Sequence, residues 1–187
     1  MARDSIKTAF AQHQQPGADE VARQARLIQE HVDFTLINAM AANALIVNAN
    51  RQVVFASERF LSLLGKDEKA EVLGKRPGEL FGCERIWDAD TGCGTRDGCR
   101  YCGALKVVLA SLEGCRSQGE CRLATQAGNR IEAYDLQILG TPMDVGGETF
   151  VLVVMQDISH EKRRRSLERI FFHDILNTTG GMHNMVQ

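Results

Sequence analysis

The chain has 187 residues, of which 44% are hydrophobic and 25% are charged, as is typical of one globular domain with extensions. Its formal net charge of −2 excludes a general electrostatic affinity for nucleic acid or for an anionic membrane. The longest apolar run, Phe150 to Met155, is far shorter than the roughly 20 residues of a membrane-spanning helix, and the N-terminus has no signal-peptide core. We therefore predict a cytoplasmic protein without a membrane span, whose cysteines stay reduced.

The N-terminal part divides into an arm and a helix. Residues 1–17 are polar and end in Gln-Gln-Pro-Gly, which is typical of a flexible segment. Residues 18–42 are predicted to form an amphipathic helix, because apolar residues recur every three or four positions. These residues are Val21, Ala25, Ile28, Val32, Leu36 and Met40. Their face is expected to pack on the next domain, to form a dimer seam, or both.

Residues 43–159 are predicted to form one α+β domain. Short strands at 45–47 and 52–56 precede helical segments at 58–64 and 69–73, and a further helix begins near Ala104. Three strands follow, at about 119–125, 130–139 and 148–156. Because strands and helices do not alternate, we predict an antiparallel five-stranded sheet with flanking helices.

A Gly- and Cys-rich insertion at residues 81–103 is too long for a tight turn, and long ordered loops are often functional. Cys83, Cys93, Cys99 and Cys102 follow the spacing C-x9-C-x5-C-x2-C. The last two form a suitable half-site for a tetrahedral metal or an iron–sulfur cluster, so we predict these four as ligands. Cys121, on a predicted strand, is an alternative ligand in place of Cys83. A thiol–disulfide switch without metal is the third hypothesis, beside iron–sulfur and structural zinc.

Several segments resemble parts of a PAS domain. Residues 44–48 and 52–56 resemble its first hairpin, and residues 58–64 resemble the helix that follows. Residues 153–159 end in Asp157-Ile158-Ser159 and resemble the last PAS strand with its Asp-Ile-Thr type of exit. The resemblance spans about residues 36–159 and implies a PAS sensor domain at 43–159. Because PAS domains often hold a sensing cofactor, the resemblance favours an iron–sulfur cluster over zinc.

Residues 160–187 are predicted to form a helix with an apolar stripe. Within it, residues 172–177, Phe-His-Asp-Ile-Leu-Asn, resemble the H-box in the dimerisation helix of histidine kinases. The resemblance implies that His173 is the phosphoacceptor, that Asp174 is the general base and that Asn177 positions water during dephosphorylation. The chemistry suits these residue types, since a neutral imidazole is nucleophilic near pH 7 and an adjacent carboxylate can accept its proton.

Together these features predict the sensory and phosphoacceptor segment of a two-component sensor histidine kinase. The resemblance implies a homodimer that passes its phosphoryl group to a response regulator. Nothing in the chain resembles the glycine-rich ATP-binding domain, so ATP would act only through a missing domain and this polypeptide is not expected to phosphorylate itself. The alternative is a non-enzymatic PAS interaction module with a structural zinc site, in which His173 is incidental.

Overall fold

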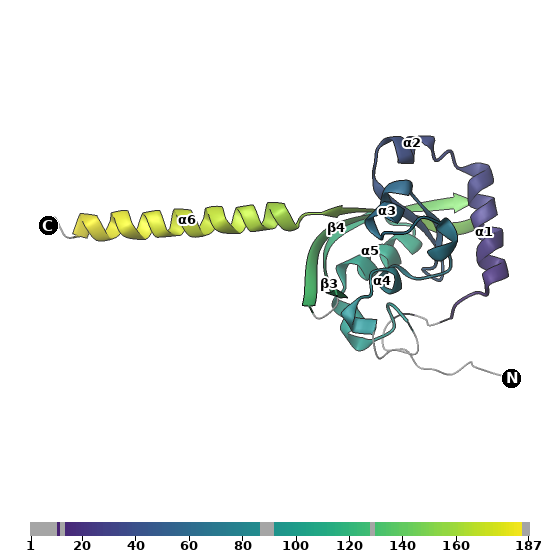
Figure 1. Ribbon diagram of the computed structural model, residues 1–187, viewed down its shortest axis with the longest axis horizontal. Coiled ribbons are helices and arrows are strands. Elements are labelled where there is room, and N and C mark those ends of the chain that lie inside the picture. The colour runs from purple at the N-terminus through teal and green to yellow at the C-terminus, as the bar shows by residue number, and fades with distance from the viewer. Residues whose placement is uncertain (1–10, 12–13, 87–91, 128–129, 185–187) are drawn as a thin grey trace.

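The computed structural model describes residues 11, 14–86, 92–127 and 130–184 (Figure 1). The strands are β1 (Asn43–Asn48), β2 (Val53–Ala56), β3 (Ser117–Ala127), β4 (Arg130–Val145) and β5 (Glu148–Asp157). The helices are α1 (Ala18–His31), α2 (Thr35–Ala39), α3 (Glu58–Leu63), α4 (Pro77–Leu80), α5 (Gly103–Leu112) and α6 (Ser159–Asn184). Three 3-10 helices are η1 (Lys69–Glu71), η2 (Glu84–Ile86) and η3 (Asp97–Tyr101).

The five strands form one antiparallel sheet in the order β2-β1-β5-β4-β3. The first hairpin and the last three strands are therefore joined through the β1–β5 pair, in which Leu45 lies opposite Val153. The segment between β2 and β3 supplies the short helices and α5. This arrangement confirms the predicted fold class, an α+β, PAS-like five-stranded sheet with flanking helices.

Each face of the sheet has its own hydrophobic core, because successive residues of a strand point to opposite faces. Leu45 and Val47 of β1 pack with α3 and α5 on one face, together with Phe60 and Val107. Ile46 points the other way and packs beneath α1. A strand buried on both faces reads as a continuous apolar run, which is why β1 shows no alternation in the sequence.

The predicted helix over residues 18–42 is divided in the structure. Helix α1 ends at His31, and α2 begins at Thr35, whose N–H donates to the Asp33 carboxylate at 2.9 Å. Val21, Ala25 and Ile28 are buried, whereas Leu36 and Met40 are exposed. The α1 face thus packs on its own domain, and the single apolar stripe predicted for the whole segment is wrong beyond residue 31.

Other boundaries shift by less. The helical segment expected at 69–73 is only the 3-10 helix η1, β4 continues six residues past the predicted end at 139, and the insertion at 81–103 contains η2 and η3. Helix α6 extends away from the domain as a single long helix (Figure 1). In the described part of the chain, no helix combines the length and the apolar character that a membrane crossing requires.

Candidate functional site

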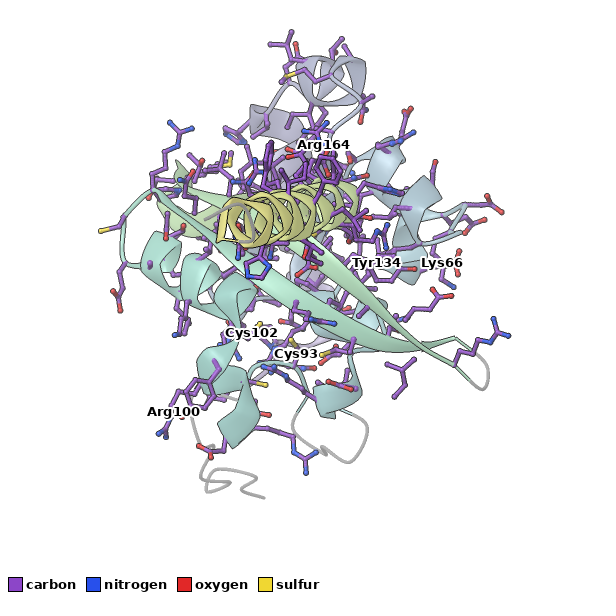
Figure 2. The ribbon with its side chains drawn as sticks, turned by 90° about the vertical axis from the view of Figure 1, so that its left-hand side faces the viewer. Lys66, Cys93, Arg100, Cys102, Tyr134 and Arg164 are labelled. Carbon is purple, nitrogen blue, oxygen red and sulfur yellow. The ribbon has the colours of Figure 1, made fainter. Side chains whose placement is uncertain are left out.

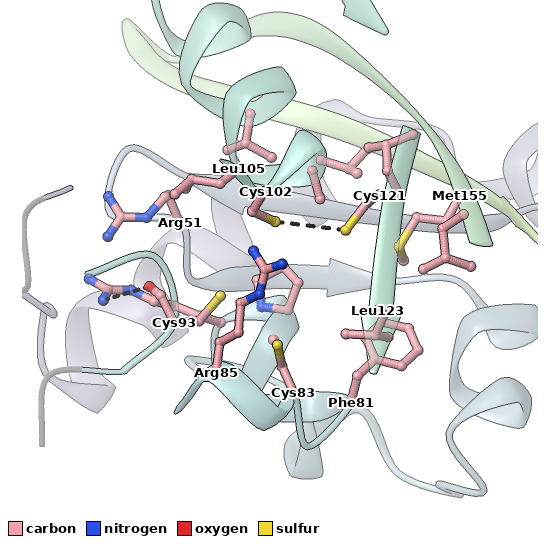
Figure 3. A pocket seen from close by; sticks show the side chains of 18 of the residues that line it. Arg51, Phe81, Cys83, Arg85, Cys93, Cys102, Leu105, Cys121, Leu123 and Met155 are labelled. Carbon is pink, nitrogen blue, oxygen red and sulfur yellow. Dashed lines mark hydrogen bonds between the residues drawn. The ribbon is translucent and has the colours of Figure 1, made fainter. Parts of the chain in front are cut away.

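A pocket of about 90 Å³ lies between the sheet and the segment that runs from α4 to α5. Four cysteines line it: Cys83, Cys93, Cys102 and Cys121 (Figure 3). Its walls are apolar, with residues such as Leu105, Leu123 and Met155. The volume is well below the roughly 300–1,000 Å³ of cavities that hold drug-sized ligands. Among the described residues that line the pocket there is no carboxylate, so its donor chemistry is that of thiols.

Cys93 is held by the residues around α4. Its N–H donates to the Glu79 carboxylate at 3.2 Å, and its carbonyl accepts from Arg76 Nη1 at 3.3 Å. Glu79 in turn accepts from the Arg76 N–H at 2.9 Å. Gly78 makes room for the sulfur, because a Cβ at that position would lie 2.6 Å from Cys93 Sγ. These contacts fix the insertion against the pocket.

Cys83 is positioned by the end of α4 and by β3. Its N–H donates to the Gly78 carbonyl at 2.9 Å, and it forms an isolated bridge with Thr125. The Thr125 hydroxyl donates to the Phe81 carbonyl at 2.6 Å, which holds the start of the insertion on the sheet. Cys83, the first cysteine of the insertion, is therefore held at the pocket by its contacts with β3.

Cys102 and Cys121 face one another across the junction of α5 and β3, with 3.7 Å between their sulfur atoms (Figure 3). Cys102 is the N-cap residue of α5. The backbones approach closely because the residue after Cys102 is Gly103, where a Cβ would collide with the Glu120 carbonyl. Figure 2, viewed nearly along α6, shows the labelled Cys93 and Cys102 on the side of α5 and η3.

The environment of the pocket shifts the protonation of its thiols. Burial raises the pKa of Cys93 to about 12 and also raises the pKa of Cys83. The hydrogen bond between the other two cysteines lowers the pKa of Cys102 and raises that of Cys121. Cys102 is therefore the pocket thiol with the strongest tendency to be a thiolate, which is the nucleophilic and metal-binding form.

Four arginine side chains contribute to the lining of the pocket. Arg51, Arg76, Arg85 and Arg122 line the pocket, and Arg51 and Arg76 are buried. Burial, with the neighbouring charge of Arg76, lowers the pKa of Arg51 to about 10, so its guanidinium remains charged at neutral pH. Arg85 Nη1 donates to the Gly98 carbonyl at 2.7 Å, beside Cys99. The arginine charges favour thiolates in the pocket, but burial opposes them and prevails at Cys83 and Cys93, whose pKa values are raised.

The predicted ligand set is brought together in part. Cys83, Cys93 and Cys102 line the pocket, whereas Cys99 is buried in η3 and is not among the described lining residues. Cys121, the predicted alternative ligand, does line it, and Cys115 is exposed. Within the described part of the chain, no three His, Cys, Asp or Glu side chains stand close enough to form a ready-made metal site. Thiolate donors nevertheless suit zinc and iron–sulfur clusters.

The predicted exit from the domain forms a compact hydrogen-bond network. The Ser159 N–H and hydroxyl both donate to the Asp157 carboxylate, at 2.9 and 2.5 Å. The Ser159 hydroxyl also accepts from the Asp135 N–H at 2.9 Å. One turn later, Lys162 Nζ lies 2.6 Å from the Glu120 carboxylate and 3.1 Å from that of Asp135. The start of α6 is thus tied to β3 and β4.

The predicted phosphoacceptor His173 lies on α6 and is exposed. The backbone of Asp174 and Asn177 is helical, but their side chains lie outside the described part of the structure. The roles predicted for these two side chains therefore stay predictions. Exposed apolar side chains accompany His173 along the helix; they are Leu167, Ile170, Phe171, Phe172 and Ile175.

Sequence reasoning missed the arginines of the pocket and the Glu120–Lys162 contact. Arg51 and Arg76 read as ordinary polar residues near turns, and only the tertiary structure buries them beside thiols. Lys162 belongs to the basic run 162–165, which is typical of a solvated helix face. The position of Arg76 directly before Pro77 and Gly78, between a predicted helix and the cysteine segment, could have indicated that it lies near the site.

No protein-family model matches this sequence, and no curated protein matches it either. Several solved structures are similar. A PAS domain from a two-component sensor histidine kinase has 11% identity and a TM-score of 0.43 over 74% of this chain and 98% of that chain. The PAS domain of nitrogen regulation protein NR(II) from Vibrio parahaemolyticus has 12% identity and a TM-score of 0.45 over 66% of this chain and 94% of that chain.

A sensory box histidine kinase/response regulator from Burkholderia thailandensis E264 has 17% identity and a TM-score of 0.44, over 78% of this chain and 99% of that chain. These similarities say nothing about a ligand or an activity of this chain.

Proposed function

We propose that this chain is a PAS sensor module in which a cysteine pocket responds to a redox or small-molecule signal and controls the terminal helix that carries His173. The observation that carries the proposal is the convergence of Cys83, Cys93, Cys102 and Cys121 on one small pocket. These residues come from the insertion, from the start of α5 and from β3, so their meeting requires the whole domain to fold.

A thiolate-bound metal centre is the proposed cofactor. The four pocket cysteines would hold it, with Cys99 as the alternative ligand from the neighbouring 3-10 helix. The donor set fits an iron–sulfur cluster or zinc, and the buried arginines suit the negative charge that several thiolates bring. An iron–sulfur cluster would supply redox or oxygen sensitivity, whereas zinc would make the site structural.

The pocket and the signalling helix have a short physical connection. Cys121 is adjacent in β3 to Glu120, whose carboxylate contacts Lys162 in the second turn of α6. Gly103, adjacent to Cys102, packs against the backbone of Glu120. A change of bonding at either cysteine would therefore act on the strand that anchors α6. Switches of this kind need a two-state element that the signal biases.

The proposed output is phosphorylation of His173 within a sensor histidine kinase, followed by transfer to a response regulator. Its support is the exposed position of His173 on a long helix that leaves the domain. The 187-residue chain should accept label from ATP when a separate histidine-kinase ATP-binding domain is supplied. His173→Gln should abolish the label, and His160→Gln, on the same helix, should retain it. Equal labelling of both variants would contradict the phosphoacceptor role.

The metal proposal is tested on protein purified without oxygen, by visible absorption and by metal and sulfide analysis. Broad thiolate-to-iron bands that disappear in Cys93→Ser and Cys102→Ser, but persist in the exposed-site control Cys115→Ser, would support an iron–sulfur sensor. A colourless protein with about one zinc per chain would support the structural alternative. Absence of both metals from freshly purified protein would contradict the proposed cofactor.

A further inference from the structure

Cys102 and Cys121 are placed to react with one another. Their sulfurs are 3.7 Å apart, and the gap to a disulfide bond of about 2.05 Å is roughly 1.7 Å. Among the described residues, no other pair of cysteine sulfurs forms a hydrogen bond. Both residues line the pocket, whose volume of about 90 Å³ is several times the roughly 10–15 Å³ that one water molecule needs. A small oxidant therefore fits beside the two sulfurs.

We propose that Cys102 and Cys121 form a reversible disulfide when the metal-free chain meets a peroxide-class oxidant. The proposal goes beyond the proposed function, because it requires no metal and no kinase activity. Cys102 is the attacking residue because its side chain is only partly buried, whereas that of Cys121 is buried. Cys121 is the resolving residue because it is the thiol in contact with Cys102.

The reaction balances in two steps. The Cys102 thiolate attacks one peroxide oxygen, the O–O bond breaks, sulfur is oxidised to sulfenic acid, and the other oxygen leaves as hydroxide and takes up a proton to become water. The Cys121 sulfur then attacks the Cys102 sulfur, the S–O bond breaks, and the hydroxyl leaves as water with the proton of the Cys121 thiol. In total, two thiols and one hydrogen peroxide yield one disulfide and two waters.

The bond would join the N-terminus of α5 covalently to β3. Glu120, which precedes Cys121, contacts Lys162 of α6 at 2.6 Å. The modification therefore lies one residue from the contact that anchors the signalling helix. Cys83 and Cys93 line the same pocket, but neither forms a hydrogen bond to the sulfur of another described cysteine, so the proposal specifies one pair among the six cysteines.

The sequence allows a direct test, because trypsin places each of the six cysteines on a different peptide. The 187-residue chain is stripped of metal with a chelator, reduced, desalted without oxygen, treated with hydrogen peroxide, alkylated and digested without reduction. The expected product links the peptide 101–106 to the peptide 117–122, and the number of alkylated thiols falls from six to four. Recovery of both peptides unlinked, or linkage of Cys102 to another cysteine, would overturn the proposal.

Two cysteine variants and one experiment with added zinc make the test specific. Cys115→Ser should retain the linked peptide, and Cys121→Ser should lose it and yield Cys102 as a sulfenic acid that dimedone traps. A different disulfide at Cys102 in Cys121→Ser would contradict the specific pairing. Preloading with zinc should suppress the link if the pocket holds metal. Unchanged linkage with zinc present would count against the metal centre and leave the disulfide proposal standing, so the two failures are distinguishable.

Discussion

At the scale of single residues, Ser159 connects the end of the sheet to the start of α6 through two hydrogen bonds of its hydroxyl. Its side chain is buried, and its hydroxyl donates to Asp157 while it accepts from the Asp135 N–H. Removal of the hydroxyl leaves the Asp135 N–H without this acceptor at the junction between β4 and α6. A buried donor that loses its partner costs more than the hydrogen bond itself contributes.

We therefore expect Ser159→Ala to lower the free energy of unfolding by about 1–3 kcal/mol, the usual cost of leaving a buried donor without its acceptor. The measurement is equilibrium denaturation of the 187-residue chain followed by circular dichroism. Ser166→Ala, on the exposed surface of the same helix, is the matched control and should have almost no effect. Equal stability of the two variants would show that the exit network contributes nothing.

At the scale of elements, the packing of α5 on β3 brings Cys102 to Cys121. Gly103 permits this approach, because any side chain there would collide with the Glu120 carbonyl. A second glycine, Gly140 of β4, also lets α5 lie close to the sheet, because a Cβ at Gly140 would lie 2.8 Å from Val107 of α5. The helix thus lies unusually close to the sheet at two glycines, and the pocket depends on that closeness.

We expect Gly103→Ala to separate α5 from β3 and to destabilise the fold by about 1–3 kcal/mol, the range for overpacking a close contact. The same variant should slow formation of the Cys102–Cys121 disulfide, because the two sulfurs move apart. Denaturation and the rate of peptide linkage measure the two effects. Gly17→Ala is the control, because a Cβ at Gly17 meets nothing within 4 Å. If both substitutions behave alike, the close approach does not govern the pocket.

At the scale of the whole molecule, α6 has an apolar stripe that its own domain does not cover. Leu167, Ile170 and Phe171 are 67%, 55% and 62% exposed, and Ile175 continues the stripe one turn further. The spacing of three and four residues is that of a coiled-coil seam. A second copy of the chain is the proposed occupant, in keeping with the homodimer predicted from the sequence.

We expect Ile170→Glu to weaken self-association more than tenfold, because full burial of such a side chain contributes roughly 1.5–3 kcal/mol and 1.4 kcal/mol corresponds to a factor of ten. Sedimentation velocity over a concentration series measures the change. Arg169→Glu places the same charge on the opposite side of the helix and should leave the equilibrium nearly unchanged. A monomeric wild-type chain at all concentrations would contradict the dimer.

Local sequence patterns were sufficient for much of the fold. The apolar run around Ile46 and the last strand, 148–156, predicted β1 and β5 because strands of this kind are recognised by composition and turn residues alone. The division of residues 18–42 at His31 was not predictable in this way. The periodicity continues through the break, where Phe34 stacks on Phe55 of β2 with ring centroids 3.8 Å apart, a contact between residues distant in the sequence.

The candidate site, too, could be predicted only in part from local sequence patterns. By itself, the sequence determined that this protein is an α+β domain with a Cys-rich insertion and a charged helix after its last strand, because local propensity and spacing are readable along a chain. Only the tertiary structure decided that Cys121, rather than Cys99, lines the pocket with the other cysteines, and that Arg51 and Arg76 are buried near them. Long-range contacts such as that between Cys102 and Cys121 arise from how α5 packs on β3, which spacing along the sequence does not encode.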